Sequence, residues 1–165
     1  MKIYANIREI ADEFDYFILD LWGLLHDGVK AYPGAVNCLE SLKKAGKTCV
    51  PVSNSFYRSH NVRDCNLAPK GFAPRNFAGL LTAGEVALQT LNRDYDRQTG
   101  FLLGDPEDHT DLTNAVNVHW TCSPDEAEFV LAAQTQDHYT LTHDEYEWLR
   151  HLAHRNLPMI CANPD

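Results

Sequence analysis

The chain of 165 residues is 44% hydrophobic and 22% charged, and its formal net charge is −9. This balance is typical of a globular chain, with room for one ordinary domain or for one small domain and part of another, and it excludes a disordered polypeptide. The acidity argues against nucleic acid and anionic membranes as partners, because both select clustered Lys and Arg, and we interpret it as a solubility feature.

The sequence also indicates the cellular compartment of the protein. No apolar run approaches the ~20 residues of a membrane span, and residues 1–15 lack the apolar region and cleavage site of a signal peptide. We therefore expect a cytoplasmic protein. Five cysteines without a Cys-x-x-Cys pair indicate buried free thiols in a reducing compartment; they are Cys38, Cys49, Cys65, Cys122 and Cys161.

Strands and helices alternate in the first half of the chain. The predicted order is a buried strand over 16–20, a helix over 33–46, a strand over 47–55 and a helix over 58–72. Pro33 suits the first turn of the first helix and Gly46 its end, whereas the second helix is expected to stop before Pro69. This alternation is the signature of a parallel sheet with right-handed crossovers.

The second half continues the pattern with weaker signals. It predicts a helix over 82–95, strands over 100–105 and 128–134, a helix over 142–156 and a last strand over 157–165. Both helices open with a capping box, formed by Thr82 with Glu85 and by Thr142 with Glu145. We place the domain boundary near residues 79–82, which gives domains over 1–81 and 82–165.

Polar side chains follow the first two predicted strands. Asp20 ends the run "FILD", and Ser53 opens "SNS" at the end of the next strand. Ligands of open parallel sheets bind at the carboxyl ends of the strands, so an acid and a hydroxyl at that edge suit phosphoryl transfer. An alternative stays open, in which Asp20 only caps a turn and "SNS" is only a loop.

Several motifs in order carry a family resemblance. They are "FILDLWG", the Asp-Gly pair at 27–28, "PGA" at 33–35, "SNS" at 53–55, "LTAGEVAL", "FLLGD" and the terminal "CANPD". Together they resemble the haloacid dehalogenase (HAD) superfamily, and within it class IIA, the branch of p-nitrophenyl phosphatase-like enzymes. The resemblance implies an α/β fold, with the N-terminal part of a doubly wound parallel core and an inserted, partial α/β cap of the C2 type.

The resemblance also implies a chemistry. It makes the chain part of a Mg²⁺-dependent phosphatase that acts on a small phosphate ester through an aspartyl phosphate. Asp20 would be the nucleophile, and Mg²⁺ would be bound by its carboxylate and by the backbone carbonyl of Trp22. Ser53 and Asn54 would bind the transferring phosphoryl group, and the cap would choose the substrate.

One departure from the family pattern concerns Trp22. The family places there a second aspartate that protonates the leaving oxygen and activates water, whereas an indole only donates a hydrogen bond. The loss of such acid–base help, typically worth ~10²–10⁴ in rate, should affect alkyl phosphates more than aryl or acyl phosphates. His26 and Asp27 are candidate replacements, although Asp27 before Gly28 also has the simpler interpretation of a turn residue.

The second departure is that two motifs of the family are missing. After its cap the family carries a phosphate-binding lysine and a Gly-Asp…Asp motif for the metal, and this sequence has neither after the cap-like segment. The first 80 residues predict only two strands, where open sheets have ~4–6. We therefore expect an N-terminal part of a class IIA protein that is inactive alone. Two alternatives stay open: a non-catalytic phosphoryl-ligand-binding or interaction protein, and a homo-oligomer that covers exposed apolar edges.

Other candidate sites are weaker. His151 and His154, together with His143, lie on the predicted helix 142–156 and could share a face as metal ligands do, but a solvated face explains them equally simply. The acidic segment 104–111 misses the spacing of a calcium loop and is interpreted as a polar turn.

Overall fold

The computed structural model describes residues 3–133 and 143–162. The chain forms two compact units, which we call the first unit (residues 1–53 and 59–81) and the second unit (residues 54–58 and 82–165). Segment 54–58 therefore folds with the second unit although it directly follows a strand of the first, a feature that the sequence did not indicate.

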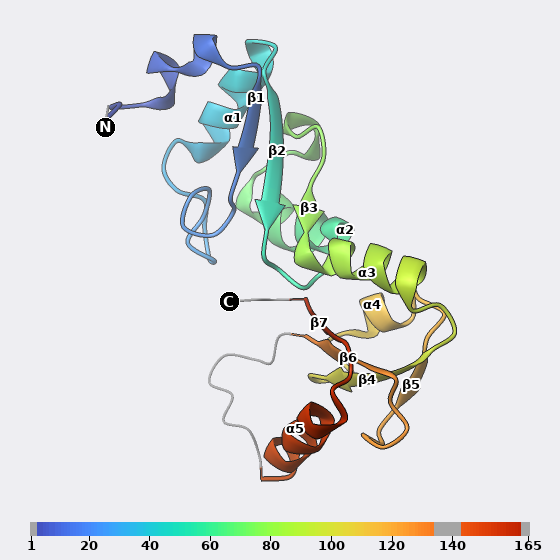
Figure 1. Cartoon of the computed structure of the whole chain (residues 1–165). Coiled ribbons are helices and arrows are strands. Elements are labelled where there is room, and N and C mark those ends of the chain that lie inside the picture. Colours follow the sequence, from blue (N-terminus) through green and yellow to red (C-terminus); the bar gives the residue numbers. More distant parts are fainter. Residues whose placement is uncertain (1–2, 134–142, 163–165) are drawn as a thin grey trace. The chain divides into compact units, whose positions relative to one another are not determined.

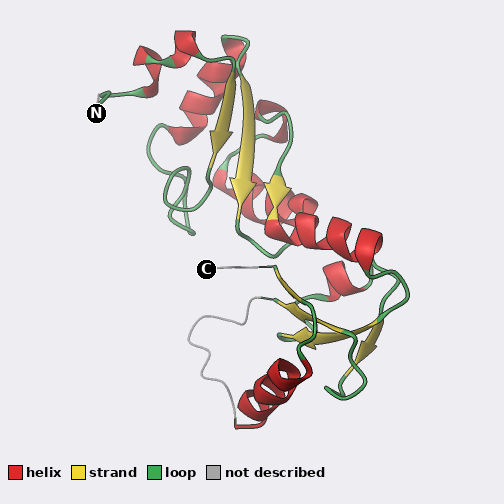
Figure 2. Ribbon diagram, viewed as in Figure 1, coloured by secondary structure: helices red, strands yellow, loops and turns green. Residues whose placement is uncertain are grey.

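The first unit is built on a three-stranded sheet (Figures 1 and 2). Its strands are β1 (Tyr16–Leu19), β2 (Thr48–Ser53) and the short β3 (Leu81–Thr82), in the order β1-β2-β3. β1 and β2 are parallel, with Leu19 opposite Pro51, and helix α1 (Ala35–Lys44) connects them. The predicted parallel strand–helix–strand unit is therefore confirmed, whereas β3 is too short for an apolar run to reveal it.

Helix α1 packs its apolar face into the core of the first unit. Leu39 and Leu42, three residues apart, are both buried, as the helical period requires. Gly46 follows the helix with a φ of 76°, in the left-handed region that favours glycine at a helix end, as predicted. The core residues around the helix are Phe17, Leu21, Leu25, Leu39, Leu42, Cys49, Val62, Leu67 and Phe72.

The segment after β2 differs from the predicted single helix. It consists of one turn of helix α2 (Ser59–Asn61), a π-helical stretch (Val62–Leu67) and a 3₁₀ turn (Ala68–Lys70). The π-helical stretch ends at Leu67, before Pro69, as predicted. Pro69 lies in the first turn of the separate 3₁₀ element, where a missing N–H costs nothing. The segment ends at Gly71, whose φ is 89°.

The predicted buried strand over 16–20 is buried on only one of its two faces. Phe17 points into the core, but Tyr16 and Ile18 are 75% and 79% exposed. β1 is the edge strand of its sheet in the described residues, and its alternating pattern places these two apolar side chains on an uncovered face. A homo-oligomer would cover this face, and that alternative stays a prediction.

The second unit carries a four-stranded parallel sheet in the order β5-β4-β6-β7. Its strands are β4 (Thr99–Leu103), β5 (His119–Thr121), β6 (Phe129–Ala132) and β7 (Met159–Cys161); its helices are α3 (Ala83–Asp94), α4 (Thr110–Thr113) and α5 (His143–Arg155). The sequence predicted all of these except β5 and α4, which span only three and four residues.

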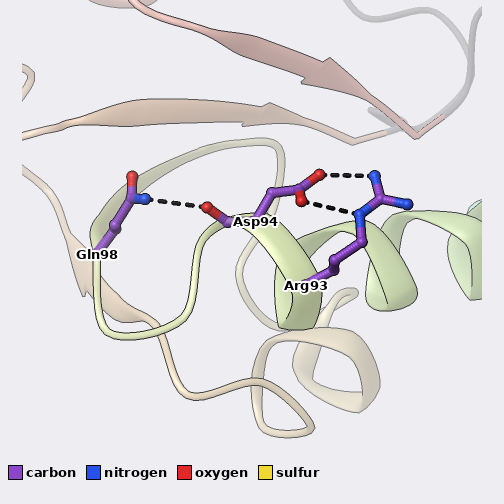
Figure 3. Close-up of polar contacts among 3 residues, drawn as sticks. All are labelled: Arg93, Asp94 and Gln98. Atoms are coloured by element: carbon purple, nitrogen blue, oxygen red, sulfur yellow. Dashed lines mark hydrogen bonds and ion pairs between the residues drawn. The ribbon is translucent and has the colours of Figure 1, made fainter.

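Both ends of α3 are held by local polar contacts. Thr82 Oγ1 accepts a hydrogen bond from the Glu85 amide at 3.1 Å, as the predicted capping box requires. At the other end, the Arg93 guanidinium pairs with the Asp94 carboxylate, and the side-chain amide of Gln98 donates to the Asp94 backbone carbonyl at 3.1 Å (Figure 3). The second predicted capping box depends on Thr142, which lies outside the described residues.

β6 lies at the centre of the second unit. Phe129, Val130 and Leu131 are each at most 1% exposed, which fits an inner strand covered on both faces. Beside it, Gly100 on β4 leaves no room for a side chain, since a Cβ there would lie 2.6 Å from the Phe129 ring.

Among residues 3–133 and 143–162, no helix combines the length and apolar character needed to cross a membrane.

Segment 54–58 contacts the start of α3 so closely that only glycine fits. The Gly84 amide donates to the Ser55 carbonyl at 3.1 Å, and a Cβ on Gly84 would lie 1.8 Å from the Phe56 carbonyl oxygen. The backbone contact therefore fixes residue 84 as glycine and attaches segment 54–58 to the second unit.

We predict that Gly84→Ala destabilises the protein by at least the ~1–3 kcal/mol typical of overpacking, because backbone rather than a flexible side chain would have to move. Gly79→Ala is the matched control, since its Cβ would meet nothing within 4 Å, and it should stay within about 0.5 kcal/mol of the parent. Urea unfolding measures both changes, and equal midpoints for the two variants would contradict the contact.

Candidate functional site

Asp20 lies at the carboxyl end of β1, one residue beyond the last paired position, Leu19. Its side chain is exposed, and its Oδ1 atom accepts a hydrogen bond from the Leu21 amide at 2.7 Å. This bond orients the carboxylate at the tip of the strand, where it can meet a ligand from solvent.

Ser53 ends the neighbouring strand. Because β1 and β2 are parallel and Leu19 lies opposite Pro51, Ser53 reaches the same edge of the sheet as Asp20. Ser53 is half-buried, and the exposed Asn54 after it begins the segment that folds with the second unit. The structure thus brings Asp20 and Ser53 to one sheet edge within the first unit.

The loop that follows Asp20 is closed by its own backbone. The Leu21 carbonyl accepts from the amides of Leu25 and His26, at 2.9 and 3.2 Å, and the Gly23 amide donates to the His26 carbonyl at 2.9 Å. Gly23 has a φ of 80°, so the turn requires a residue that adopts the left-handed region without strain. The loop therefore has one defined path from the strand tip.

Trp22 occupies an outward position in this loop and is 70% exposed. Its indole lies over Gly28, where a Cβ would be 3.4 Å from the ring. The two hydrogen bonds of the bridge between Trp22 and His26 use the Leu21 carbonyl and the Gly23 amide, and not the Trp22 carbonyl. The Trp22 carbonyl oxygen therefore accepts no hydrogen bond within this bridge.

Asp27 is a turn residue. Its Oδ1 atom accepts hydrogen bonds from the amides of Val29 and Lys30, at 2.9 and 2.8 Å. These backbone bonds, with that from Lys30 the stronger cause, hold the pKa of Asp27 below its ordinary value. An ionised, turn-forming carboxylate is a poor replacement for an acid that must deliver a proton.

His26 is the buried centre of the loop, only 3% exposed. Its Nδ1 atom accepts a hydrogen bond from the Gly28 amide at 3.0 Å, so the neutral ring carries its proton on Nε2. Burial lowers the pKa of His26, the charge of Lys70 lowers it further, and Asp27 and Asp20 partly oppose them. In this state neither nitrogen offers a lone pair to water, so His26 does not act as the missing base.

Lys70 is a charged neighbour of His26 that the sequence analysis did not identify. Its Nζ atom donates to the carbonyl and the side-chain oxygen of Asn66, at 3.0 and 3.1 Å, and its charge acts on His26. No local motif connects position 70 with position 26, because only the irregular helical segment after β2 brings them together.

The first unit offers oxygen donors that suit Mg²⁺ in kind. Mg²⁺ prefers carboxylate and carbonyl oxygens and usually keeps several waters, needing only one or two carboxylates beside the substrate phosphate. The Asp20 carboxylate and the Trp22 carbonyl are donors of this type. In the described part of the chain, no three His, Cys, Asp or Glu side chains gather in a way that could hold a metal ion.

The remaining candidates have structural explanations. His151 Nε2 lies 2.7 Å from Asp125 Oδ1 on an exposed surface, and His154 is exposed too, which fits a solvated helix face. In segment 104–111 the Asp105 carboxylate accepts from the Glu107 amide, as in a polar turn. The sequence did not reveal that His109 is buried in this segment, with its ring 4.5 Å from that of Phe56.

Comparison with known proteins places this geometry in context. The model of a family described as haloacid dehalogenase-like hydrolase matches residues 17–116. The chain is 31% identical over 105 residues to chronophin of Bos taurus, covering 61% of this chain and 36% of that protein. It is 25% identical over 119 residues to a 4-nitrophenylphosphatase of Schizosaccharomyces pombe, covering 69% and 40%.

Among solved structures, a haloacid dehalogenase-like hydrolase of Brucella suis 1330 matches with a TM-score of 0.83 at 26% identity. That match covers 99% of this chain and 61% of the other. The chain thus spans well under half of the length of the two curated relatives, and under two thirds of this structural neighbour.

Proposed function

The chain belongs to the haloacid dehalogenase-like hydrolases, in their class IIA, and on this premise we propose that it supplies the nucleophile of a phosphatase for a small phosphorylated metabolite. One observation carries the proposal: the exposed, oriented Asp20 carboxylate lies at the same sheet edge as Ser53, inside the matched region. We further propose that the first unit is part of the core and the second unit part of a cap.

The proposed reaction has two steps at Asp20. A carboxylate oxygen attacks the phosphorus of the ester, and the bond from phosphorus to the leaving oxygen breaks. The leaving oxygen departs with the bonding electron pair and takes a proton from solvent water. Water then attacks the phosphorus of the aspartyl phosphate, which releases inorganic phosphate and restores the carboxylate. The hydrogen bond from the Leu21 amide supports this role because it holds the carboxylate in one orientation.

Ser53 and Asn54 are proposed to bind the phosphoryl oxygens through the hydroxyl and the side-chain amide. The Asp20 carboxylate and the Trp22 carbonyl are the proposed protein ligands of Mg²⁺. When bound, this ion would neutralise charge that develops on the phosphoryl oxygens. The oxygen character of both donors supports this assignment.

Trp22 narrows the class of substrate that we propose. Its indole supplies no acid for the leaving oxygen, so esters with a good leaving group should react best. Aryl phosphates, acyl phosphates and anhydrides meet this condition, and the name of the Schizosaccharomyces pombe relative refers to an aryl phosphate. A cytoplasmic location and a homo-oligomer remain part of the proposal.

Trp22 also favours a second candidate function. Trp22 in place of an acid–base group suits a protein that binds phosphoryl ligands without turning them over. Calorimetry with a phosphate ester and Mg²⁺ on the full-length protein distinguishes the two functions: binding without release of inorganic phosphate supports the second function, and release supports the first.

We predict that Asp20→Asn abolishes release of p-nitrophenol from p-nitrophenyl phosphate by the full-length protein, because an amide is not a nucleophile of comparable strength. Asp15→Asn is the control, since Asp15 is an exposed acid just before β1 whose partner is Lys47, 3.3 Å away. It should keep activity within a few-fold. Unchanged activity in Asp20→Asn would remove the proposed nucleophile.

We also predict that Trp22→Asp raises the rate on an alkyl phosphate more than on p-nitrophenyl phosphate, by up to ~10²–10⁴, because only the alkoxide needs a proton as it leaves. Trp22→Asn is the matched control, because it removes the same contact with Gly28 without adding an acid. Steady-state kinetics on both substrates measure the ratio. Equal ratios for the Asp and Asn variants would show that Trp22 does not limit leaving-group protonation.

A further inference from the structure

His26 carries a buried hydrogen-bond donor that the loop does not use. The Nε2 atom is buried and has no hydrogen-bond partner within residues 3–133 and 143–162. Buried donors are almost always paired, and an unpaired one calls for a specific explanation. Motion of the ring does not explain the missing partner of Nε2, because the Gly28 amide donates a hydrogen bond to Nδ1 at 3.0 Å and fixes the ring.

The position of the ring is fixed from both sides. The His26 backbone forms one bridge with Trp22 and another with Ala31, so the residue lies between the two arms of the loop that leaves Asp20. The Tyr32 amide donates to the Leu25 carbonyl at 2.9 Å and closes the second arm. The loop therefore holds the imidazole in one place, and the Gly28 amide fixes the tautomer with its proton on Nε2.

The ring has a cationic neighbour, Lys70, which suits an anionic acceptor. Lys70 acts on His26 more strongly than either Asp27 or Asp20 does singly. The Asp27 carboxylate already accepts hydrogen bonds from two backbone amides. A neutral N–H donor near a lysine, on the loop that follows the proposed nucleophile, suits the oxygen of an incoming oxyanion.

We infer that His26 is a binding residue, and that its Nε2–H donates a hydrogen bond to an oxygen of the oxyanion bound at the tip of β1. The oxyanion is the phosphoryl group of the proposed reaction, so the inference rests on the proposed function. Because Nε2 is covered in this structure, the loop has to shift when the oxyanion binds. The amide of Gly28, which donates to the same ring, should therefore sense the ligand as well.

Nuclear magnetic resonance on the uniformly ¹⁵N-labelled full-length protein tests the donor directly, because it observes both the His26 ring and the Gly28 amide. Without ligand, His26 should show a proton on Nε2 and none on Nδ1. Titration with inorganic phosphate in the presence of Mg²⁺ should move the Nε2–H proton signal downfield, with the same midpoint as the Gly28 amide. A general salt effect would instead move all histidine signals together, and that result would overturn the inference.

Two isosteric variants separate the two ring nitrogens. His26→Asn keeps an acceptor near Nδ1 for the Gly28 amide but removes the Nε2 donor, whereas His26→Gln keeps a donor near Nε2 and removes that acceptor. We expect His26→Asn to weaken phosphate binding about tenfold or more, the usual effect of losing a hydrogen bond to a charged group. His26→Gln should stay within about threefold of the parent.

The outcomes distinguish this inference from the proposed function. If calorimetry shows phosphate binding but the Nε2–H signal does not respond, or if His26→Asn binds phosphate like the parent, the inference fails and the proposed function stands. If phosphate does not bind to the parent protein at all, both fail. The measurement on the parent protein needs no variant, so it decides the question even if His26→Asn does not fold.

Discussion

The parallel pairing of β1 with β2 is the constraint on which the candidate site depends. Leu19 opposite Pro51 sets the register, and this register brings Asp20 and Ser53 to one edge of the sheet although they are far apart in the chain. A shift by one residue would turn the side chains of β1 to the opposite faces and expose Phe17 instead of Ile18. The core of the first unit thus fixes the geometry at the strand tips.

The loop after β1 adds a second layer of organisation to this edge. His26 joins its two arms through backbone bridges, and its Nδ1 atom holds the Gly28 amide, over which the Trp22 indole lies. The tryptophan and the histidine are therefore parts of one arrangement. Under the proposed function, the tryptophan replaces an acid by an apolar surface and the histidine is the proposed donor. We therefore expect the site to bind a phosphoryl group more readily than it protonates a leaving oxygen.

The sequence predicted those parts of the molecule that local patterns determine. The apolar run before Asp20 predicted β1, the helical period of Leu39 and Leu42 predicted α1, and the motifs together indicated the family. The elements β5 and α4 escaped because three or four residues carry no usable period. The burial of His26 and its proximity to Lys70 could not be predicted, since they depend on how the loop and the irregular helical segment pack in three dimensions.

The central claim is that Asp20 accepts a phosphoryl group, and chemical trapping tests it most directly. The full-length protein is mixed with p-nitrophenyl phosphate and Mg²⁺, quenched with acid and reduced with borohydride, which converts an aspartyl phosphate to homoserine. Mass spectrometry of the peptide that contains residue 20 then reads the result. We expect homoserine at position 20, dependent on substrate, whereas inorganic phosphate released without modification of Asp20, or with another residue modified, would contradict the account.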